Sequence, residues 1–193
     1  MPAQLTPDER TTLLKIARQS LIDAANGRSA TPLPEHLTPA LLEIGASFVT
    51  LTVRGQLRGC IGTLEAYQPL AKDVRQRAAQ AATQDYRFPQ VRPSEVGLIH
   101  IEISRLTKPE PLPYSDPAEL PKLLRPHVDG VVLSDGMHQA TFLPQVWEQL
   151  PEPDQFLNHL CQKMGTQSDL WRRRVLQVEI YQVEEFKKIN KAQ

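Results

Sequence analysis

The sequence is poor in cysteine and has no net charge, and both facts limit what the protein can do. Only two of its 193 residues are cysteines, Cys60 and Cys161, and 22 basic residues balance 22 acidic ones. A neutral chain gives no support to bulk electrostatic binding of nucleic acid or of an anionic membrane. The sequence also lacks an apolar run of transmembrane length, and its first residues lack the basic and apolar regions of a signal peptide. We therefore expect a cytoplasmic protein with reduced thiols and with neither a nucleic-acid nor a membrane partner.

The usual signatures of cofactors and metals are missing too. The sequence contains no Walker pattern and no G-x-G-x-x-G loop for phosphates. None of its five histidines forms a short ligand pair with a cysteine, and no Cys-x-x-Cys occurs. We predict no metal site and no cofactor.

The hydrophobic pattern that is present predicts an α+β fold. Thr6-Pro7-Asp8-Glu9 is a capping box that begins a helix, and Asn26-Gly27 ends it. Further helices are predicted over 70–85 and 153–164, and strands over 48–53, 57–63, 98–106 and 176–180, with a hairpin around Asp135-Gly136. Strands joined by tight turns pair antiparallel. We expect an antiparallel-rich mixed sheet with flanking helices.

The most unusual stretch is LRGCIGT, residues 57–63, a strand pattern with two glycines around a thiol. A strict period of two turns Leu57 and Ile61 toward the core and places Arg58 and Cys60 on the opposite face. The two side chains are then roughly 6.5 to 7 Å apart along the strand. A guanidinium at that range favours the thiolate, which is the reactive form of cysteine. This pattern makes Cys60 a candidate nucleophile and Arg58 its activator or an anchor for a small anionic ligand.

The glycines of this stretch allow two interpretations. Gly59 and Gly62 remove side chains beside the thiol, so that a ligand can approach closely. Alternatively, the glycines are structural: they mark a β-bulge, or the alanine-lined face of the 70–82 helix packs against them, and Cys60 is a small buried hydrophobe. The sequence leaves both open.

A second candidate group follows the 70–85 helix, in Asp85-Tyr86-Arg87-Phe88-Pro89. Asp85 lies at a helix C-terminus, where the helix dipole disfavours an anion. Such a carboxylate is either held by a neighbouring arginine, Arg87 or Arg58, or belongs to a functional site. We include Asp85 as a candidate catalytic residue and Arg87 as a candidate ligand-binding residue. The basic run Arg172-Arg173-Arg174 is better explained as a solvated surface than as a nucleic-acid site.

These two motifs together resemble the AMMECR-one domain family, in its prokaryotic branch known as AmmeMemoRadiSam system protein A. The resemblance extends over nearly the whole chain through shorter matches in the same order: Phe48–Leu51, Ile103–Leu106, Asp129–Val131, Leu143–Val146, Phe156-Leu157 and Lys163–Gly165. It implies one α+β domain over residues 1–193 with a larger and a smaller lobe. We expect the smaller lobe to consist of the N-terminal helix and the 108–128 segment.

The resemblance also implies partners: a Memo-like protein and a radical S-adenosylmethionine protein. It marks Arg58, Gly59, Cys60 and Gly62 as positions of the family's suspected functional motif. Two functions follow as alternatives. In the first, the 57–62 motif forms a small-ligand or catalytic site. In the second, the protein is a non-enzymatic module that binds the two partners.

Overall fold

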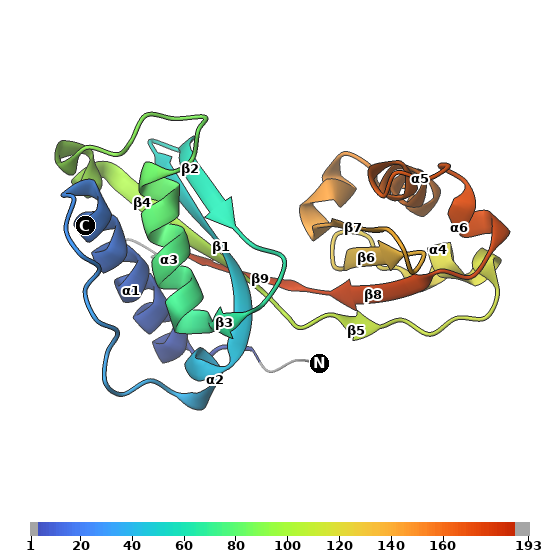
Figure 1. Ribbon diagram of the computed structural model, residues 1–193, viewed down its shortest axis with the longest axis horizontal. Helices are drawn as coiled ribbons and strands as arrows, with labels where there is room; N and C mark the ends of the chain where they lie inside the picture. Colours follow the sequence, from blue (N-terminus) through green and yellow to red (C-terminus); the bar gives the residue numbers. More distant parts are fainter. Residues whose placement is uncertain (1–3, 188–193) are drawn as a thin grey trace. The chain divides into compact units, whose positions relative to one another are not determined.

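The computed structural model describes residues 4–187 and divides into two units (Figure 1). Unit 1 takes the chain up to Leu106 together with the segment from Glu184 onward, and unit 2 comprises Thr107–Val183. Each unit has its own sheet, its own helices and its own apolar core. The α+β class with antiparallel pairing and flanking helices is confirmed. None of the described helices is long and apolar enough to span a bilayer.

Unit 1 begins with the predicted capped helix. α1 (Pro7–Ala25) has Thr6 as its N-cap, and Thr6 and Glu9 bond each other's backbone N–H as a capping box. The remaining helical segments of this unit are α2 (Pro39–Leu42), α3 (Leu70–Thr83) and the 3-10 turn η1 (Pro93–Leu98). Helices α1 and α3 lie side by side (Figure 1), and the Ser20 hydroxyl donates to the Arg75 carbonyl at 2.6 Å.

The sheet of unit 1 has the order β2-β1-β4-β9, and β3 pairs with the first residues of β1, Ile44 and Gly45. Its strands are β1 (Ile44–Val53), β2 (Gln56–Gly62), β3 (Gln68–Pro69), β4 (Ile99–Leu106) and β9 (Val183–Lys187). β1 pairs antiparallel with β2, β3 and β4. The hairpin between β1 and β2 turns through Arg54 and Gly55, whose φ values are both positive at 52° and 79°. Positive φ at both central residues is typical of a type I′ turn, which matches the twist of paired strands.

The two faces of this sheet differ in character. Val49, Leu51, Ile101 and Ile103 point into the core and pack with the alanines of α3. Because side chains alternate along a strand, the intervening residues lie on the other face. We call this the distal face, the face turned away from α1 and α3; it carries Phe48, Thr50, Thr52, Cys60, Gly62, His100, Glu102 and Ser104.

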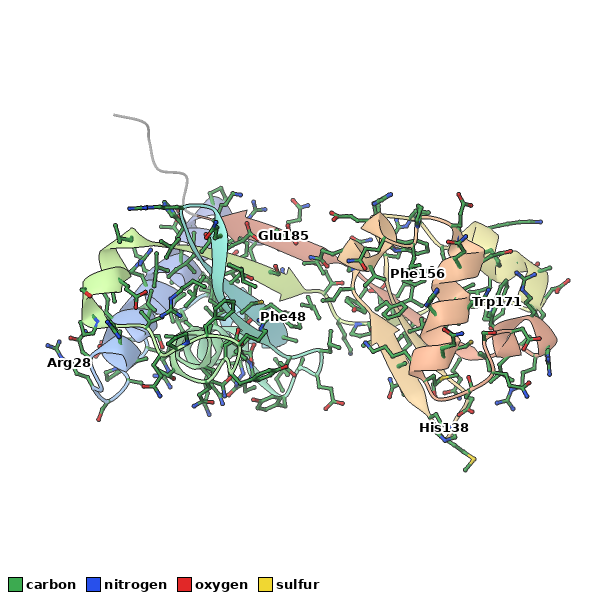
Figure 2. The ribbon with its side chains drawn as sticks, turned by 90° about the horizontal axis from the view of Figure 1, so that it is seen from above. Arg28, Phe48, His138, Phe156, Trp171 and Glu185 are labelled. Atoms are coloured by element: carbon green, nitrogen blue, oxygen red, sulfur yellow. The ribbon has the colours of Figure 1, made fainter. Side chains whose placement is uncertain are left out.

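Unit 2 has a four-stranded sheet in the order β5-β8-β6-β7. Its elements are β5 (Glu110–Pro111), η2 (Pro117–Glu119), α4 (Leu120–Leu123), β6 (Gly130–Ser134), β7 (Gln139–Phe142), η3 (Pro144–Glu148), α5 (Pro153–Lys163), α6 (Leu170–Arg173) and β8 (Gln177–Tyr181). The core is built on Trp147 and Phe156, whose rings stack with centroids 3.7 Å apart. Figure 2 shows Phe156 and Trp171 within this unit, and His138 at the far end of the β6–β7 hairpin.

Three expectations need correction. The N-terminal helix packs in unit 1 while residues 108–128 belong to unit 2, so these segments do not form one lobe. The strands form two separate sheets, because each unit buries its own apolar faces. The sequence pattern predicted one final strand, whereas the chain forms β8 and then β9, with one strand in each sheet.

Candidate functional site around Cys60

A β-bulge in β2 changes which side chains of LRGCIGT lie together. Thr50 is opposite Cys60 and Leu51 is opposite Gly59, but Thr52 is opposite Leu57, so Arg58 has no partner on β1. An extra residue in one strand breaks the period of two at that point. Leu57 is therefore not a core residue, and 43% of it is exposed. The predicted common face of Arg58 and Cys60 is wrong for the same reason.

Arg58 instead fastens β2 to the segment that follows α3. Its guanidinium forms a two-pronged pair with the Glu95 carboxylate, with N–O distances of 3.1 and 3.2 Å. It also donates to the carbonyls of Pro89, at 2.8 Å, and Gln90, at 3.3 Å. Hydrogen bonds from Arg58 hold the pKa of the Glu95 carboxyl below its usual range. Most of the donors of this side chain are thus used within the protein.

Gly59 is required by the packing of helix α3. A Cβ atom built on Gly59 would overlap the backbone carbonyl oxygen of Ala81 and lie 3.7 Å from Leu51 Cδ1. Only glycine lets the strand and the helix backbone come this close. Helix α3 therefore occupies the space beside Gly59. This agrees with the structural interpretation of this glycine.

Gly62 is required by an aromatic ring on the neighbouring strand. It is directly opposite Phe48 on β1, and a Cβ atom there would overlap the Phe48 ring. The same Cβ would lie 2.6 Å from the Ser47 carbonyl oxygen. The structure thus explains both glycines of the motif by close packing inside unit 1.

Asp85 and Arg87 cover the backbone of Cys60 at the open edge of the sheet. β2 is the last strand on its side, and the Cys60 N–H donates to Asp85 Oδ2 at 2.8 Å. Arg87 donates to the Cys60 carbonyl at 3.2 Å and to both carboxylate oxygens of Asp85, at 2.9 and 2.7 Å. Unpaired N–H and C=O groups on an edge strand are open to unwanted pairing with other chains. The Asp85–Arg87 pair satisfies them at Cys60 and fixes the strand there.

Burial and ionisation differ between the two members of this pair. The Asp85 residue is only 4% exposed, whereas 45% of the Arg87 side chain is exposed. Hydrogen bonds from Arg87 and from the Cys60 N–H outweigh the effect of burial and hold the pKa of Asp85 well below its usual range. The Asp85 carboxyl is therefore an anion at neutral pH, and it accepts hydrogen bonds from the Cys60 N–H and from Arg87. Of the predicted ion pairs, it forms the one with Arg87.

The Cys60 side chain lies on the distal face and is half-buried. Its sulfur is 3.2 Å from Oγ1 of Thr50, the residue directly across on β1. Cys161 offers a contrast, because it is a fully buried residue of the unit 2 core and burial raises the pKa of its thiol. Both cysteines are free thiols, and they differ in access.

Sequence reasoning missed two groups here, Thr50 and Glu95. Neither stands in an unusual sequence context, because one is an ordinary strand threonine and the other an ordinary turn glutamate. Only the pairing of β1 with β2 and the return of the chain after α3 bring them to the motif.

The basic run at 172–174 is paired with acidic side chains. Arg172, Arg173 and Arg174 each form an ion pair, with Asp154, Asp169 and Asp135 respectively. Within residues 4–187, no group of three or more His, Cys, Asp or Glu side chains is arranged to hold a metal ion.

An open cavity of about 460 Å³ lies in unit 2. Its lining comes from the Pro111–Tyr114 segment, from β6 and β7 and from the 175–179 segment, and includes Ser134, Gln139 and Glu179. None of the six predicted site residues lines it. Nothing in the sequence pattern pointed to this cavity.

The chain is similar to known proteins over most of its length. The AMMECR1 family model matches residues 14–186. The chain is 40% identical over 168 residues to a protein of Methanothermobacter thermautotrophicus, covering 86% of this chain and 88% of that one. It is 34% identical over 198 residues to a protein of Thermofilum pendens, covering 95% and 91%. A crystal structure of an uncharacterized protein from Pyrococcus horikoshii aligns with a TM-score of 0.78 at 28% identity, covering 95% of this chain and 93% of that one.

Proposed function

The chain belongs to the AMMECR1 family, the family that its motifs resemble, and we propose that the Cys60 thiol is the reactive group of a small-ligand or catalytic site on the distal face of unit 1. The observation that carries this proposal is a half-buried thiol on a backbone fixed at both peptide groups, by Asp85 and by Arg87. A nucleophile or an attachment point needs both access and a fixed position.

Arg87 takes the role that the sequence pattern gave to Arg58. Its side chain is 45% exposed and donates to the Cys60 carbonyl, whereas the guanidinium of Arg58 is occupied by Glu95 and two carbonyls. An exposed guanidinium binds carboxylate or phosphate oxygens well. In this proposal Arg87 anchors a small anionic ligand, Asp85 positions Arg87, and Arg58, Gly59 and Gly62 hold the strand in place.

Thiol alkylation of the full chain tests the proposal. With iodoacetamide at neutral pH and peptide mass spectrometry to assign the site, Cys60 of the folded protein is expected to react at least as fast as it does in the urea-unfolded chain. Cys161 serves as the internal control and is expected to react only after unfolding, because it is fully buried. The nucleophile idea fails if folded Cys60 is as inert as Cys161, or if Cys60→Ser leaves function in the cell intact.

The family resemblance supplies the setting of this proposal. We place the protein in the cytoplasm, where free thiols persist, acting with a Memo-like protein and a radical S-adenosylmethionine protein. Support for the compartment comes from two unpaired cysteines, and support for the partners comes from the resemblance alone.

A specific observation also favours the second function, a non-enzymatic module for the same partners. Three residues of the motif have structural roles inside unit 1: Arg58 pairs with Glu95, and Gly59 and Gly62 allow close packing. If this function holds, tagged protein is expected to retain the two partners in co-purification when Cys60→Ser or Arg58→Lys is introduced. Loss of both partners in Cys60→Ser at unchanged melting temperature would favour the thiol site instead. Absence of any complex with the unsubstituted protein would count against the module.

A further inference from the structure

The antiparallel register brings Thr50 and Cys60 closer together than the two residues of a hydrogen-bonded pair. The Cys60 N–H and C=O bond to Asp85 and Arg87, outside the sheet, so Thr50 and Cys60 form a non-hydrogen-bonded pair of the β1–β2 ladder. Pairs of this kind have the shorter Cα separation and bring their side chains together. The Thr50 Oγ1 to Cys60 Sγ distance of 3.2 Å follows from this geometry.

The Thr50 hydroxyl can donate its hydrogen bond to the Cys60 sulfur. Within residues 4–187 it makes no hydrogen bond other than the one to Cys60. Its neighbour on the other side, Glu102 of β4, has its carboxylate 3.5 Å from the Lys187 ammonium. Threonine is also stiff about χ1, because it is branched at Cβ. A strand threonine between two paired strands therefore keeps its hydroxyl at the sulfur.

We infer that Thr50 is a positioning residue of the Cys60 site, which holds the sulfur in place through the hydrogen bond between Oγ1 and Sγ. In the thiol form either group can donate, since both carry a proton. When the thiol proton leaves to solvent, the sulfur can only accept, and the hydroxyl turns its proton toward it. The inference rests on the proposed reactivity of Cys60 and names a second residue needed for it.

Two substitutions at position 50 separate this role from a structural one. Thr50→Val keeps the branched shape and replaces the hydroxyl by a methyl group, and Thr50→Ser keeps the hydroxyl and loses the methyl group. A role in strand stability predicts that valine is tolerated and serine is harmful, because valine is the better strand residue. A role through the hydroxyl predicts the reverse order for thiol reactivity.

The measurement is the iodoacetamide rate of Cys60 at neutral pH, with the melting temperature recorded for each variant. We expect Thr50→Val to slow alkylation about tenfold at an unchanged melting temperature, as for loss of a hydrogen bond to a charged group. Thr50→Ser is expected to stay within about twofold of the unsubstituted protein. Thr52→Val is the matched control on the same strand and face, opposite Leu57, and is expected to leave the rate unchanged.

The outcomes distinguish this inference from the function on which it rests. A fast Cys60 in the unsubstituted protein with an equal rate in Thr50→Val overturns the role of Thr50 and leaves the reactive thiol standing. A Cys60 as slow as Cys161 before any substitution overturns the reactive thiol itself. Slowing by Thr50→Ser equal to that by Thr50→Val also overturns the role of the hydroxyl, because Thr50→Ser keeps the hydroxyl.

Discussion

Gly59→Ala is expected to lower the free energy of unfolding by about 3 kcal/mol, because the new methyl group has no space. The added Cβ atom would overlap the Ala81 carbonyl oxygen, which is backbone within helix α3 and cannot turn aside as a side chain would. Either the strand or the helix must move, and Val49 and Leu51 of the shared core must then repack. Urea unfolding followed by far-UV circular dichroism measures the change.

Gly97→Ala is the matched control for this experiment. Gly97 lies in η1 of the same unit, and a Cβ atom built there has no heavy atom within 4 Å. The substitution is expected to change the free energy of unfolding by less than about 1 kcal/mol. Equal effects of Gly59→Ala and Gly97→Ala would contradict the packing explanation and return Gly59 to the ligand interpretation.

Asp85→Asn is expected to lower the free energy of unfolding by about 2 kcal/mol at neutral pH. Asparagine has almost the same shape, but its NH2 group faces the donors of Arg87, and the charge-assisted bonds to Arg87 are lost. The Cys60 backbone then has a weaker acceptor at the sheet edge. Amide hydrogen exchange at Cys60 is expected to speed up by more than the global change in stability.

The same group predicts how stability depends on pH. The pKa of Asp85 is lowered in the folded protein, so the folded state favours the carboxylate more strongly than the unfolded chain does. Its contribution is complete above the ordinary aspartate pKa of about 4 and is lost as the pH falls from there toward the folded value. The stability difference between the unsubstituted protein and Asp85→Asn is therefore expected to shrink below about pH 4. A difference that stays constant over that range would rule out ionised Asp85 as the source.

An exposed pair provides the comparison for Asp85. The Asp154–Arg172 ion pair has an N–O distance of 2.8 Å, close to that of Asp85–Arg87, but about half of each side chain is exposed. Asp154→Asn is expected to change the free energy of unfolding by less than about 0.5 kcal/mol, because solvent screens such pairs. Similar losses for Asp154→Asn and Asp85→Asn would show that burial at the sheet edge adds nothing.

These experiments bear on function because they distinguish residues that stabilise unit 1 from residues that act in the Cys60 site. Arg58, Gly59 and Gly62 are expected to change stability when substituted, since each has a packing or bonding partner inside unit 1. Cys60 and Thr50 are expected to change reactivity, since their side chains meet on the distal face. Arg87 is expected to affect the binding of an anionic ligand through its exposed guanidinium.

The secondary structure elements and the family could be predicted from the sequence. The capping box at Thr6 began α1, Arg54-Gly55 turned the β1–β2 hairpin, and the alternation over 98–106 became β4. These features depend on residues within a few positions of one another, so local propensity and periodicity are enough to predict them. The two motifs LRGCIG and DYRFP, at 57–62 and 85–89, were specific enough to indicate the family.

The geometry of the motif depends on strand pairing and on helix packing, which the sequence pattern did not predict. A strict period of two placed Arg58 beside Cys60, but one bulge residue sent Arg58 to Glu95, 37 positions along the chain. A glycine inside a strand is compatible with a bulge, but the sequence does not say which residue is the extra one. The purpose of Gly59 likewise depended on the Ala81 carbonyl, and the partner of Cys60 proved to be Thr50. Each of these contacts depends on how neighbouring strands pair and how helix α3 packs on them, which the order of residues along one strand does not contain.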